Sequence, residues 1–250
     1  MANKNDLTVI TVAENDSGLL DLMIRSVYKY TREQPKIIIC DHGKNGNLEQ
    51  KYSSDSNIVI VKNIPQLSGG SNRHGEGLNK IFPMVNTKRT AIIESDCILL
   101  SYDWDKLNPP KQKMIAAKKG ELAMQPFYHM CFLVFSTALL KFNGGMDFRA
   151  GTDKTRRNRS YKPHEDVGWR IRNKVRLDEI KNLTFIDCKS GKGKFFGSNF
   201  QSDEIWDETT PVVGHFGRGS NIGGKSIRKG FAHPREQLSE WIKIAEDILK

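Results

Sequence analysis

Residues 90–99, with the sequence TAIIESDCIL, form an apolar segment that carries two acids near its end. The β-branched and apolar residues predict a buried strand, and Glu94 and Asp96 stand at its carboxyl end. Alternation along a strand would place both side chains on the same side. Buried carboxylates need a cation or hydrogen bonds, and a hard divalent ion that also holds substrate phosphates would supply one. The alternative is a capped strand end followed by an ordinary turn.

The first half of the chain alternates between strand and helix patterns. Strands are expected at residues 7–12, 36–40 and 57–61, and helices at residues 17–30 and from Gly69 to Phe82. Asp16 or Ser17 would cap the first helix. This alternation predicts an α/β protein, with a three-layer α/β/α sandwich around a mainly parallel sheet. Ligands of such sheets bind at the carboxyl ends of the strands.

The second half has a different pattern. Short apolar runs at residues 113–118 and 131–135 predict a small antiparallel addition, and residues 183–186 a further strand. A helix is expected over 165–175, a mobile loop over 151–163 and a terminal helix over 234–249. The apolar stripe of the terminal helix consists of Leu238, Trp241, Ile242, Ala245, Ile248 and Leu249. We expect one continuous domain over residues 1–250.

The 250 residues carry a formal net charge of +10, which points to an anionic partner. Lysine and arginine concentrate in residues 154–176, 189–194 and 218–229. A polyanion-binding surface and an ordinary solvated basic face are both open interpretations.

The cysteines and the apolar runs indicate the cellular setting. Cys40, Cys97, Cys131 and Cys188 lack the paired spacing of zinc sites, so reduced, buried thiols are expected. No apolar run has the length of a membrane span, and the N-terminus lacks the apolar core of a signal peptide. We therefore expect a cytoplasmic protein with no integral membrane segment.

Six motifs occur in a specific order. They are TVITVAEN at residues 8–15, IIICDHG at 37–43, IESD at 93–96, FNGGMD at 142–147, HEDVGWR at 164–170 and GHFGRGS at 214–220. This order resembles that of family 2-like glycosyltransferases with the GT-A fold, over roughly residues 7–220. The resemblance implies a nucleotide-sugar- and metal-binding half at 7–110, an acceptor-binding and catalytic half at 111–232, and a C-terminal helix at 233–250.

The resemblance implies a UDP-sugar donor and a divalent metal, Mn²⁺ or Mg²⁺. The metal ligands would be Asp96, His215 and Glu94; because Glu94 replaces the first aspartate of the family's D-x-D motif, metal contact would rest mainly on Asp96. A structural loop histidine is the alternative for His215. The residues assigned to the nucleotide sugar are Thr11, Ala13, Asp41, Arg73, Ser95 and Arg218. Asp41 could instead form a turn, Arg73 could be a surface residue, and Arg218 could face solvent or a polyanion.

Catalysis would rest on the acidic pair in HEDVGWR. The resemblance implies that Asp166 is the general base for an acceptor hydroxyl and that Glu165 orients the acceptor or Asp166. A base acting directly on the acceptor implies single displacement with inversion. The alternative is that both acids favour the start of a helix through its dipole.

The acceptor is inferred from charge. Arg156, Arg157, Arg159 and Lys162 lie on the expected acceptor side and would contact phosphates, so our leading hypothesis is a hydroxymethylated pyrimidine in DNA, as in bacteriophage DNA modification. Such a protein would work in the host cytoplasm. The alternatives are a cytosolic polysaccharide or lipopolysaccharide glycosyltransferase and a non-catalytic nucleic-acid-binding module. No role is assigned to His74, and the oligomeric state stays open.

Overall fold

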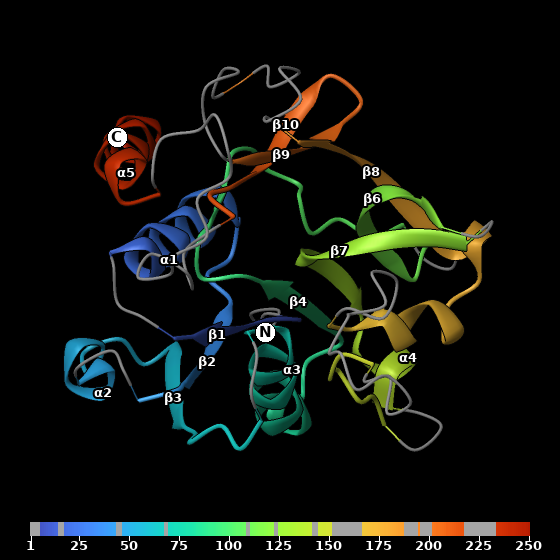
Figure 1. The fold of residues 1–250 in the computed structure, drawn as a ribbon, viewed down its shortest axis with the longest axis horizontal. Coiled ribbons are helices and arrows are strands. Elements are labelled where there is room, and N and C mark those ends of the chain that lie inside the picture. Colours follow the sequence, from blue (N-terminus) through green and yellow to red (C-terminus); the bar gives the residue numbers. More distant parts are fainter. Residues whose placement is uncertain are drawn as a thin grey trace, which may run out of the picture.

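The computed structural model describes residues 6–14, 18–43, 47–67, 70–108, 111–122, 125–141, 145–151, 167–187, 195, 202–217 and 234–250. These residues form a ten-stranded mixed sheet with helices on both faces (Figure 1). The strand order is β3-β2-β1-β4-β7-β6-β8-β9-β10-β5. The expected α/β class is confirmed.

The amino-terminal strands make the parallel part of the sheet. Three of these strands have apolar, β-branched sequences that are buried on both faces, as is typical of parallel strands between helices, whereas the edge strand is partly exposed. The strands are β1 (Leu7–Ala13), β2 (Lys36–Asp41), β3 (Ile58–Lys62) and β4 (Arg89–Ile93). The helices of this part are α1 (Leu19–Tyr30), α2 (Leu48–Lys51), α3 (Gly70–Ile81) and the 3₁₀ helix η1 (Phe82–Met84).

The remaining strands form a largely antiparallel ribbon, which is larger than the small addition expected. Its strands are β5 (Cys97–Leu99), β6 (Met114–Leu122), β7 (Gln125–Ser136), β8 (Ile180–Asp187), β9 (Asp203–Asp207) and β10 (Thr210–His215). All of its pairings are antiparallel except that of β6 with β8. We call these six strands the ribbon. Its shorter helices are α4 (Thr137–Lys141), η2 (Trp169–Asn173) and η3 (Leu177–Glu179).

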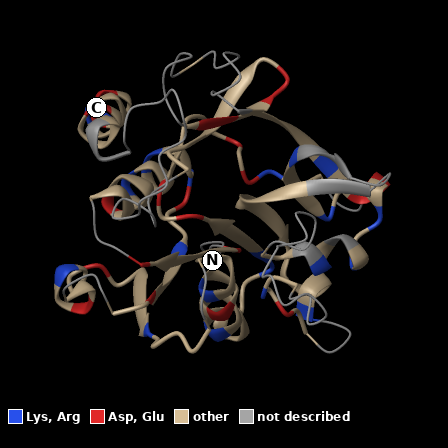
Figure 2. Ribbon diagram, in the orientation of Figure 1, with Lys and Arg blue, Asp and Glu red and all other residues tan. Residues whose placement is uncertain are grey.

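The ribbon curls back to the end of β4. Strand β5 lies at the far edge of the strand order, yet only residues 94–96 separate it from β4 in the chain. The edge formed by β10 and β5 must therefore return to the carboxyl end of β4. This closure brings residues near 215 beside residues near 95, and acidic segments lie near the middle of the view in Figure 2.

The core has one apolar layer on each face of the sheet and a third cluster under the terminal helix. Helix α1 contributes to one layer, and α3 and η1 contribute to the other. The terminal helix α5 (Pro234–Leu249) buries Trp241 against Leu19, Leu22 and Phe216, and Arg25 pairs with Glu246 at 2.6 Å. The predicted helix over 234–249 and its apolar stripe are confirmed.

Several expectations require correction. The helix expected over 165–175 is the short η2, because Gly168 has a φ of 71° that interrupts a helix before Trp169. Strands β9 and β10 were not expected, and Glu94 and Asp96 lie in a turn after β4 rather than within the strand. The caps Asp16 and Ser17 and most of the loop 151–163 lie outside the described residues.

The structure bears on the expected buried thiols and on the expected lack of a membrane span. Cys40, Cys97 and Cys131 are free and buried as expected, and Cys188 is outside the described residues. In the described part of the chain, every helix is too short or too polar to cross a membrane.

Candidate functional site

The candidate site is built on the turn that joins β4 to β5. Glu94 N–H donates to the Cys131 carbonyl of β7 at 2.9 Å, and Phe216 N–H donates to the Asp96 carbonyl at 2.9 Å. Within the turn, Cys97 N–H donates to the Glu94 carbonyl at 3.0 Å. These bonds tie the turn to two strands of the ribbon, so the positions of both carboxylates are set by the closure of the sheet.

His215 connects the two carboxylates. Its Nε2 lies 3.1 Å from Glu94 Oε2 and 3.5 Å from Asp96 Oδ1, and its side chain is only 5% exposed. His215 is the last residue of β10 and stands directly opposite Cys97 of β5. The sequence expectation that Glu94, Asp96 and His215 come together is thus met in the structure.

Asp203 contacts the second ring nitrogen of His215, Nδ1. Asp203 Oδ2 lies 3.1 Å from His215 Nδ1, and the two residues are register partners in β9 and β10. A carboxylate at Nδ1 favours the tautomer with the proton on that nitrogen, which leaves Nε2 to face Glu94 and Asp96. Sequence reasoning missed Asp203, because its strand showed no strong period.

His74 approaches Glu94 from the opposite side. It lies in helix α3, and its Nδ1 is 3.2 Å from Glu94 Oε1. Glu94 is therefore held between two imidazoles, one on each carboxylate oxygen. The sequence analysis gave His74 no role; its only signal was its place near the start of a helix that follows the parallel strand β3.

The charges of this cluster depend on each other. Burial would raise the pKa of Glu94, but the hydrogen bonds from His215 and His74 hold it well below its usual range. Burial would lower the pKa of His215, but Cys131, Asp96 and Asp203 raise it well above its usual range. A cationic group among these acids is therefore favoured at this point of the fold.

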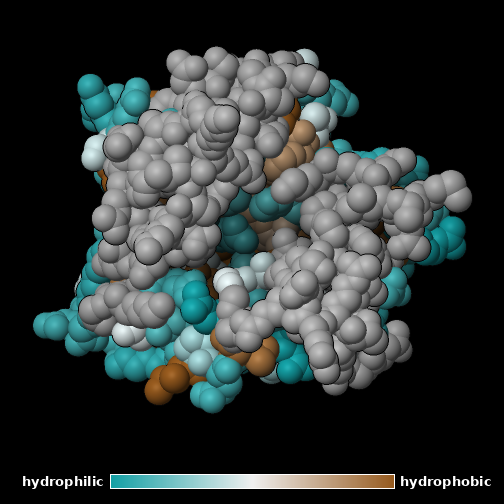
Figure 3. Space-filling model, viewed as in Figure 1, coloured by the Kyte–Doolittle hydropathy of each residue, from teal (hydrophilic) through white to brown (hydrophobic). Residues whose placement is uncertain are grey.

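The same carboxylates and imidazole fit a divalent cation. Ligand atoms of Glu94, Asp96 and His215 lie within 4.8 Å of one another. Carboxylate oxygens with one imidazole suit Mn²⁺, and carboxylates also suit Mg²⁺. The space-filling view shows hydrophilic side chains at the centre of this face, where the surface is hollowed (Figure 3).

Four of the residues expected at the nucleotide sugar, namely Thr11, Ala13, Asp41 and Ser95, lie near the carboxyl ends of β1, β2 and β4. Thr11 and Ala13 are buried in β1, and Ser95 is partly exposed in the turn. Asp41 Oδ1 accepts a hydrogen bond from Gly43 N–H at 2.8 Å, which is the turn interaction of the alternative interpretation. Arg73 lies in the first turn of α3 and forms an ion pair with Glu14.

Several predicted site residues are outside the described residues. These are Glu165, Asp166, Arg218, Arg156, Arg157, Arg159 and Lys162. The segment just after Asp166 is described: Gly168 N–H donates to the Phe148 carbonyl at 2.8 Å, and a Cβ at position 168 would collide with Met130 of β7. Residue 168 thus packs against the strand that also carries Cys131.

Two further histidine and cysteine neighbours were missed by the sequence analysis. The His129 ring packs edge-on against that of His215 with ring centres 5.2 Å apart, and it stacks on Phe185. Cys131 N–H donates to His129 Nδ1 at 3.2 Å. The sequence analysis predicted Cys131 to be a buried thiol in an apolar run, but gave it no place in the site.

The comparisons with known proteins give a likeness of fold. No family model and no curated protein matches the chain. Solved structures that match include the mannosyltransferase PcManGT of Pyrobaculum calidifontis in complex with GDP-Man and Mn²⁺, with a TM-score of 0.44 and 14% identity. That match covers 58% of this chain and 48% of the mannosyltransferase chain.

Two other solved structures match over more of this chain. Residues 1–349 of S. aureus TarS match with a TM-score of 0.46 and 15% identity over 71% of this chain and 57% of that one. Glucosyl-3-phosphoglycerate synthase of Mycobacterium tuberculosis matches with a TM-score of 0.45 and 14% identity, over 71% of this chain and 69% of its own. The match thus spans about half the length of two of these three chains.

Proposed function

We propose that this chain is a metal-dependent glycosyltransferase that moves a sugar from a UDP-sugar to an acceptor hydroxyl with inversion. The observation that carries the proposal is the convergence of Glu94, Asp96 and His215 at the carboxyl end of β4. Ligands of α/β sheets bind at this edge, and the three donors suit a hard divalent ion. The ion, when bound, neutralises the negative charge that develops on the departing diphosphate.

The chain's own residues would prepare this site. Asp96 and Glu94 supply the carboxylate donors, and Asp203 keeps the Nδ1 proton of His215 in place so that Nε2 is available as a donor. His74 donates to the second oxygen of Glu94 and fixes the orientation of that carboxylate. A neutral His215 is needed for ligation, so cation binding would release a proton from the imidazolium.

The donor nucleotide would lie along the ends of β1 and β2. The proposed nucleotide contacts are Thr11, Ala13 and Asp41, because of their positions in the strands. The proposed hydrogen-bond donors to the diphosphate are Arg73, Ser95 and Arg218. Because Thr11 and Ala13 are buried, their contribution would be to shape the end of β1 rather than to offer exposed side chains. The ion pair of Arg73 with Glu14 would have to rearrange if Arg73 is to reach a phosphate.

The proposed general base is Asp166, with Glu165 orienting it or the acceptor. The hydroxyl oxygen would attack the anomeric carbon while Asp166 accepts its proton, and the bond to the diphosphate oxygen would break on the opposite face. The support for this role is that Gly168, two residues after Asp166 in the chain, packs against Met130 of β7. The next residue of β7, Cys131, accepts a hydrogen bond from Glu94 N–H through its carbonyl.

The proposed acceptor is a hydroxymethylated pyrimidine in DNA. The support is the basic composition of residues 154–176, including Arg156, Arg157, Arg159 and Lys162. A polysaccharide or lipopolysaccharide acceptor is the second candidate, and a non-catalytic nucleic-acid-binding module the third. Each makes a different prediction in a single assay.

The test is turnover with Mn²⁺ or Mg²⁺, a panel of UDP-sugars and GDP-mannose, and hydroxymethylated or unmodified DNA. Sugar incorporation only into the modified DNA supports the whole proposal. Nucleotide release without incorporation keeps the transferase and rejects the DNA acceptor. No release with any donor, together with salt-dependent DNA binding, supports the binding module.

Two variants separate the proposed roles. Asp166→Asn should lower turnover by about 10²- to 10⁴-fold with donor binding nearly unchanged. Asp96→Ala should instead weaken metal-dependent donor binding. The control is Asp178→Asn, which changes an aspartate whose side chain is 66% exposed in η3. Equal, modest losses from the first two variants would contradict their separate roles.

A further inference from the structure

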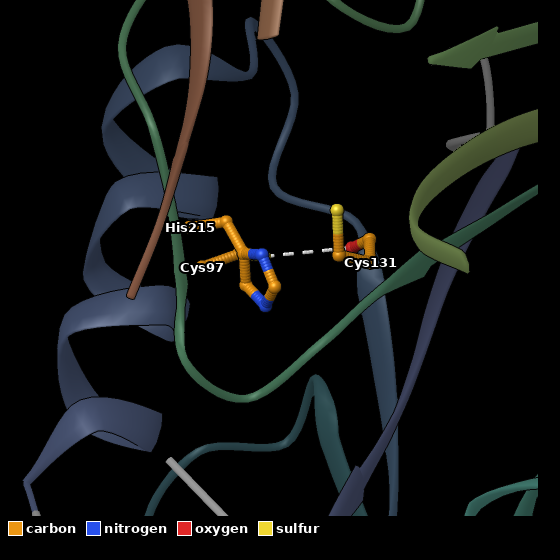
Figure 4. A group of neighbouring side chains, drawn as sticks. All are labelled: Cys97, Cys131 and His215. Carbon is orange, nitrogen blue, oxygen red and sulfur yellow. Dashed lines mark hydrogen bonds between the residues drawn. The ribbon is translucent and has the colours of Figure 1, made fainter. Parts of the chain in front are cut away.

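The proposed function leaves two buried thiols beside His215 without a task. Cys97 of β5 and Cys131 of β7 are both fully buried. One ligand atom from each, together with a ring nitrogen of His215, lies within 4.8 Å of the other two. Figure 4 shows the three side chains gathered at the end of β10 and the bond from Cys97 Sγ to the Cys131 carbonyl, which is 3.5 Å long.

Strand register, rather than chain proximity, brings these groups together. Cys97 and His215 are direct partners in the antiparallel pair of β5 and β10, so their side chains share one face. Cys131 joins them because its carbonyl accepts hydrogen bonds from both Glu94 N–H and Cys97 Sγ. The three residues meet where the ribbon closes on β4.

The ligand chemistry of this group differs from that of the carboxylate group. Two cysteine sulfurs and one imidazole prefer Zn²⁺, whereas carboxylate oxygens prefer Mg²⁺ and Mn²⁺. Zinc sites have Zn–S distances of about 2.3 Å and Zn–N distances of about 2.0 Å, so ligand atoms within 4.8 Å of one another are close enough to share one ion. Two cysteines and one histidine also leave a fourth position for water or another oxygen.

The surroundings act differently on the two thiols. His129 and His215 both lie beside Cys131, and the Cys131 amide fixes His129 through Nδ1. Burial would raise the pKa of Cys131, but the Cys97 thiol and the two imidazoles lower it well below its usual range, whereas burial and the hydrogen bond with Cys131 raise the pKa of Cys97 well above its own. Zinc binding would therefore have to displace the Cys97 proton.

We propose that Cys97, Cys131 and His215 form a zinc site that competes with the Glu94–Asp96 cation site for His215. His215 belongs to both ligand groups, so an ion held by the sulfurs removes a ligand from the carboxylates. The zinc site rests on the geometry of the three side chains and stands independently of the proposed transferase activity. Where that activity is measurable, Zn²⁺ would inhibit it in the presence of Mn²⁺.

The first experiment titrates reduced, metal-free protein with Co²⁺, a spectroscopic substitute for Zn²⁺. We expect a thiolate-to-cobalt absorption band that saturates at one ion per chain and is abolished by Zn²⁺. Loss of an outer-shell partner weakens metal affinity by about 10- to 100-fold, so loss of a direct ligand in Cys97→Ser or Cys131→Ser should cost at least about 100-fold. Cys40→Ser is the matched control, because Cys40 is equally buried but lies in the opposite core layer.

Two results would overturn the zinc site. One is the absence of a thiolate band in the wild-type protein; the other is a band that persists in the Cys97→Ser/Cys131→Ser double variant. Asp96→Asn should keep the band, which separates the sulfur site from the carboxylate site. If a serine variant fails to fold, X-ray absorption of the zinc-loaded wild-type protein decides: sulfur neighbours support the proposal, and a shell of only nitrogen and oxygen refutes it.

Discussion

On the side of the parallel strands, Glu94 meets His74 of α3; on the side of the ribbon, it meets His215 of β10. The two imidazoles lie at similar distances from the carboxylate, 3.2 and 3.1 Å, but their surroundings differ. His74 has a side chain 15% exposed, whereas His215 is 5% exposed and has Asp203 on its second nitrogen. The ribbon side is therefore the more preorganised of the two.

The difference follows from how each side is assembled. The parallel half places the two acids directly after a strand, so local sequence brings Glu94 and Asp96 to the sheet edge, where hydrogen bonds to the ribbon then fix their turn. The ribbon joins Asp203 to His215 within the β9–β10 hairpin, and strand pairing then brings this pair beside Cys97 and Cys131, which are far away in the chain. We expect substitutions on the ribbon side to affect metal binding more than substitutions on the helix side, with the shared turn most sensitive of all.

The largest effect should come from the turn. Asp96→Asn removes a negatively charged metal ligand next to His215 Nε2. The Mn²⁺ affinity measured by calorimetry should therefore fall by at least about 100-fold. Asp178→Asn, on the exposed η3, should bind Mn²⁺ as the wild type does. An Asp96→Asn protein with wild-type affinity would show that the ion does not use this turn.

A smaller loss is expected on the ribbon side at Asp203. Asp203→Asn keeps a hydrogen-bonding group near His215 Nδ1 but removes the charge that fixes the tautomer, so Mn²⁺ affinity should fall by about 10- to 100-fold. The affinity of Asp203→Glu should lie between those of Asp203→Asn and the wild type. If Asp203→Asn binds Mn²⁺ normally, Asp203 only supports the β9–β10 pairing.

The contrast between the two sides also sets what could be predicted from the sequence. The parallel strands were predictable because buried strands read as apolar runs and their carboxyl ends share one edge. Glu94 and Asp96 were found for that reason, although a turn, not strand alternation, brings them together. The terminal helix was equally predictable from its apolar stripe.

The residues on the ribbon side were harder to predict from the sequence. His215 was found only through the resemblance of its motif, since β10 has a glycine and a proline that weaken a strand pattern. His129 and Cys131 reach the site by pairing between strands far apart in the chain, which a single sequence does not encode locally, whereas Asp203 lies in the β9–β10 hairpin, whose first strand has no strong periodic pattern. His74 was missed because a histidine in a glycine-rich helix carries no periodic signal.

A substitution of His74 in α3 should weaken Mn²⁺ binding less than the substitutions of Asp96 and Asp203. His74→Gln leaves Glu94 bound to His215 and removes only a partly exposed contact with Oε1. A hydrogen bond to a charged group contributes about 1.5–3 kcal/mol when buried and less when exposed, so Mn²⁺ affinity should fall by no more than about tenfold. A larger loss than in Asp203→Asn would reverse the ranking of the two sides and assign the preorganisation to α3.

The smallest effect concerns fold stability rather than metal binding, at the contact between α3 and the segment that contains Asp147. Asp147 accepts hydrogen bonds from Asn79 of α3 at 2.9 Å and from Arg149, and these partners lower its pKa although burial raises it. Because the folded pKa lies below the unfolded value of about 3.9, the carboxylate stabilises the fold above that pH and loses this contribution as the pH falls further.

Asp147→Asn should therefore reduce the free energy of unfolding at pH 7 by about 1–2 kcal/mol, and its difference from the wild type should shrink as the pH falls below about 4. Urea unfolding at a series of pH values measures this. Asp178→Asn is again the matched control, because Asp178 also pairs with an arginine two residues away but is far more exposed. A difference that stays constant down to the lowest pH would assign the loss to packing, since only a titrating carboxylate gives a pH-dependent difference.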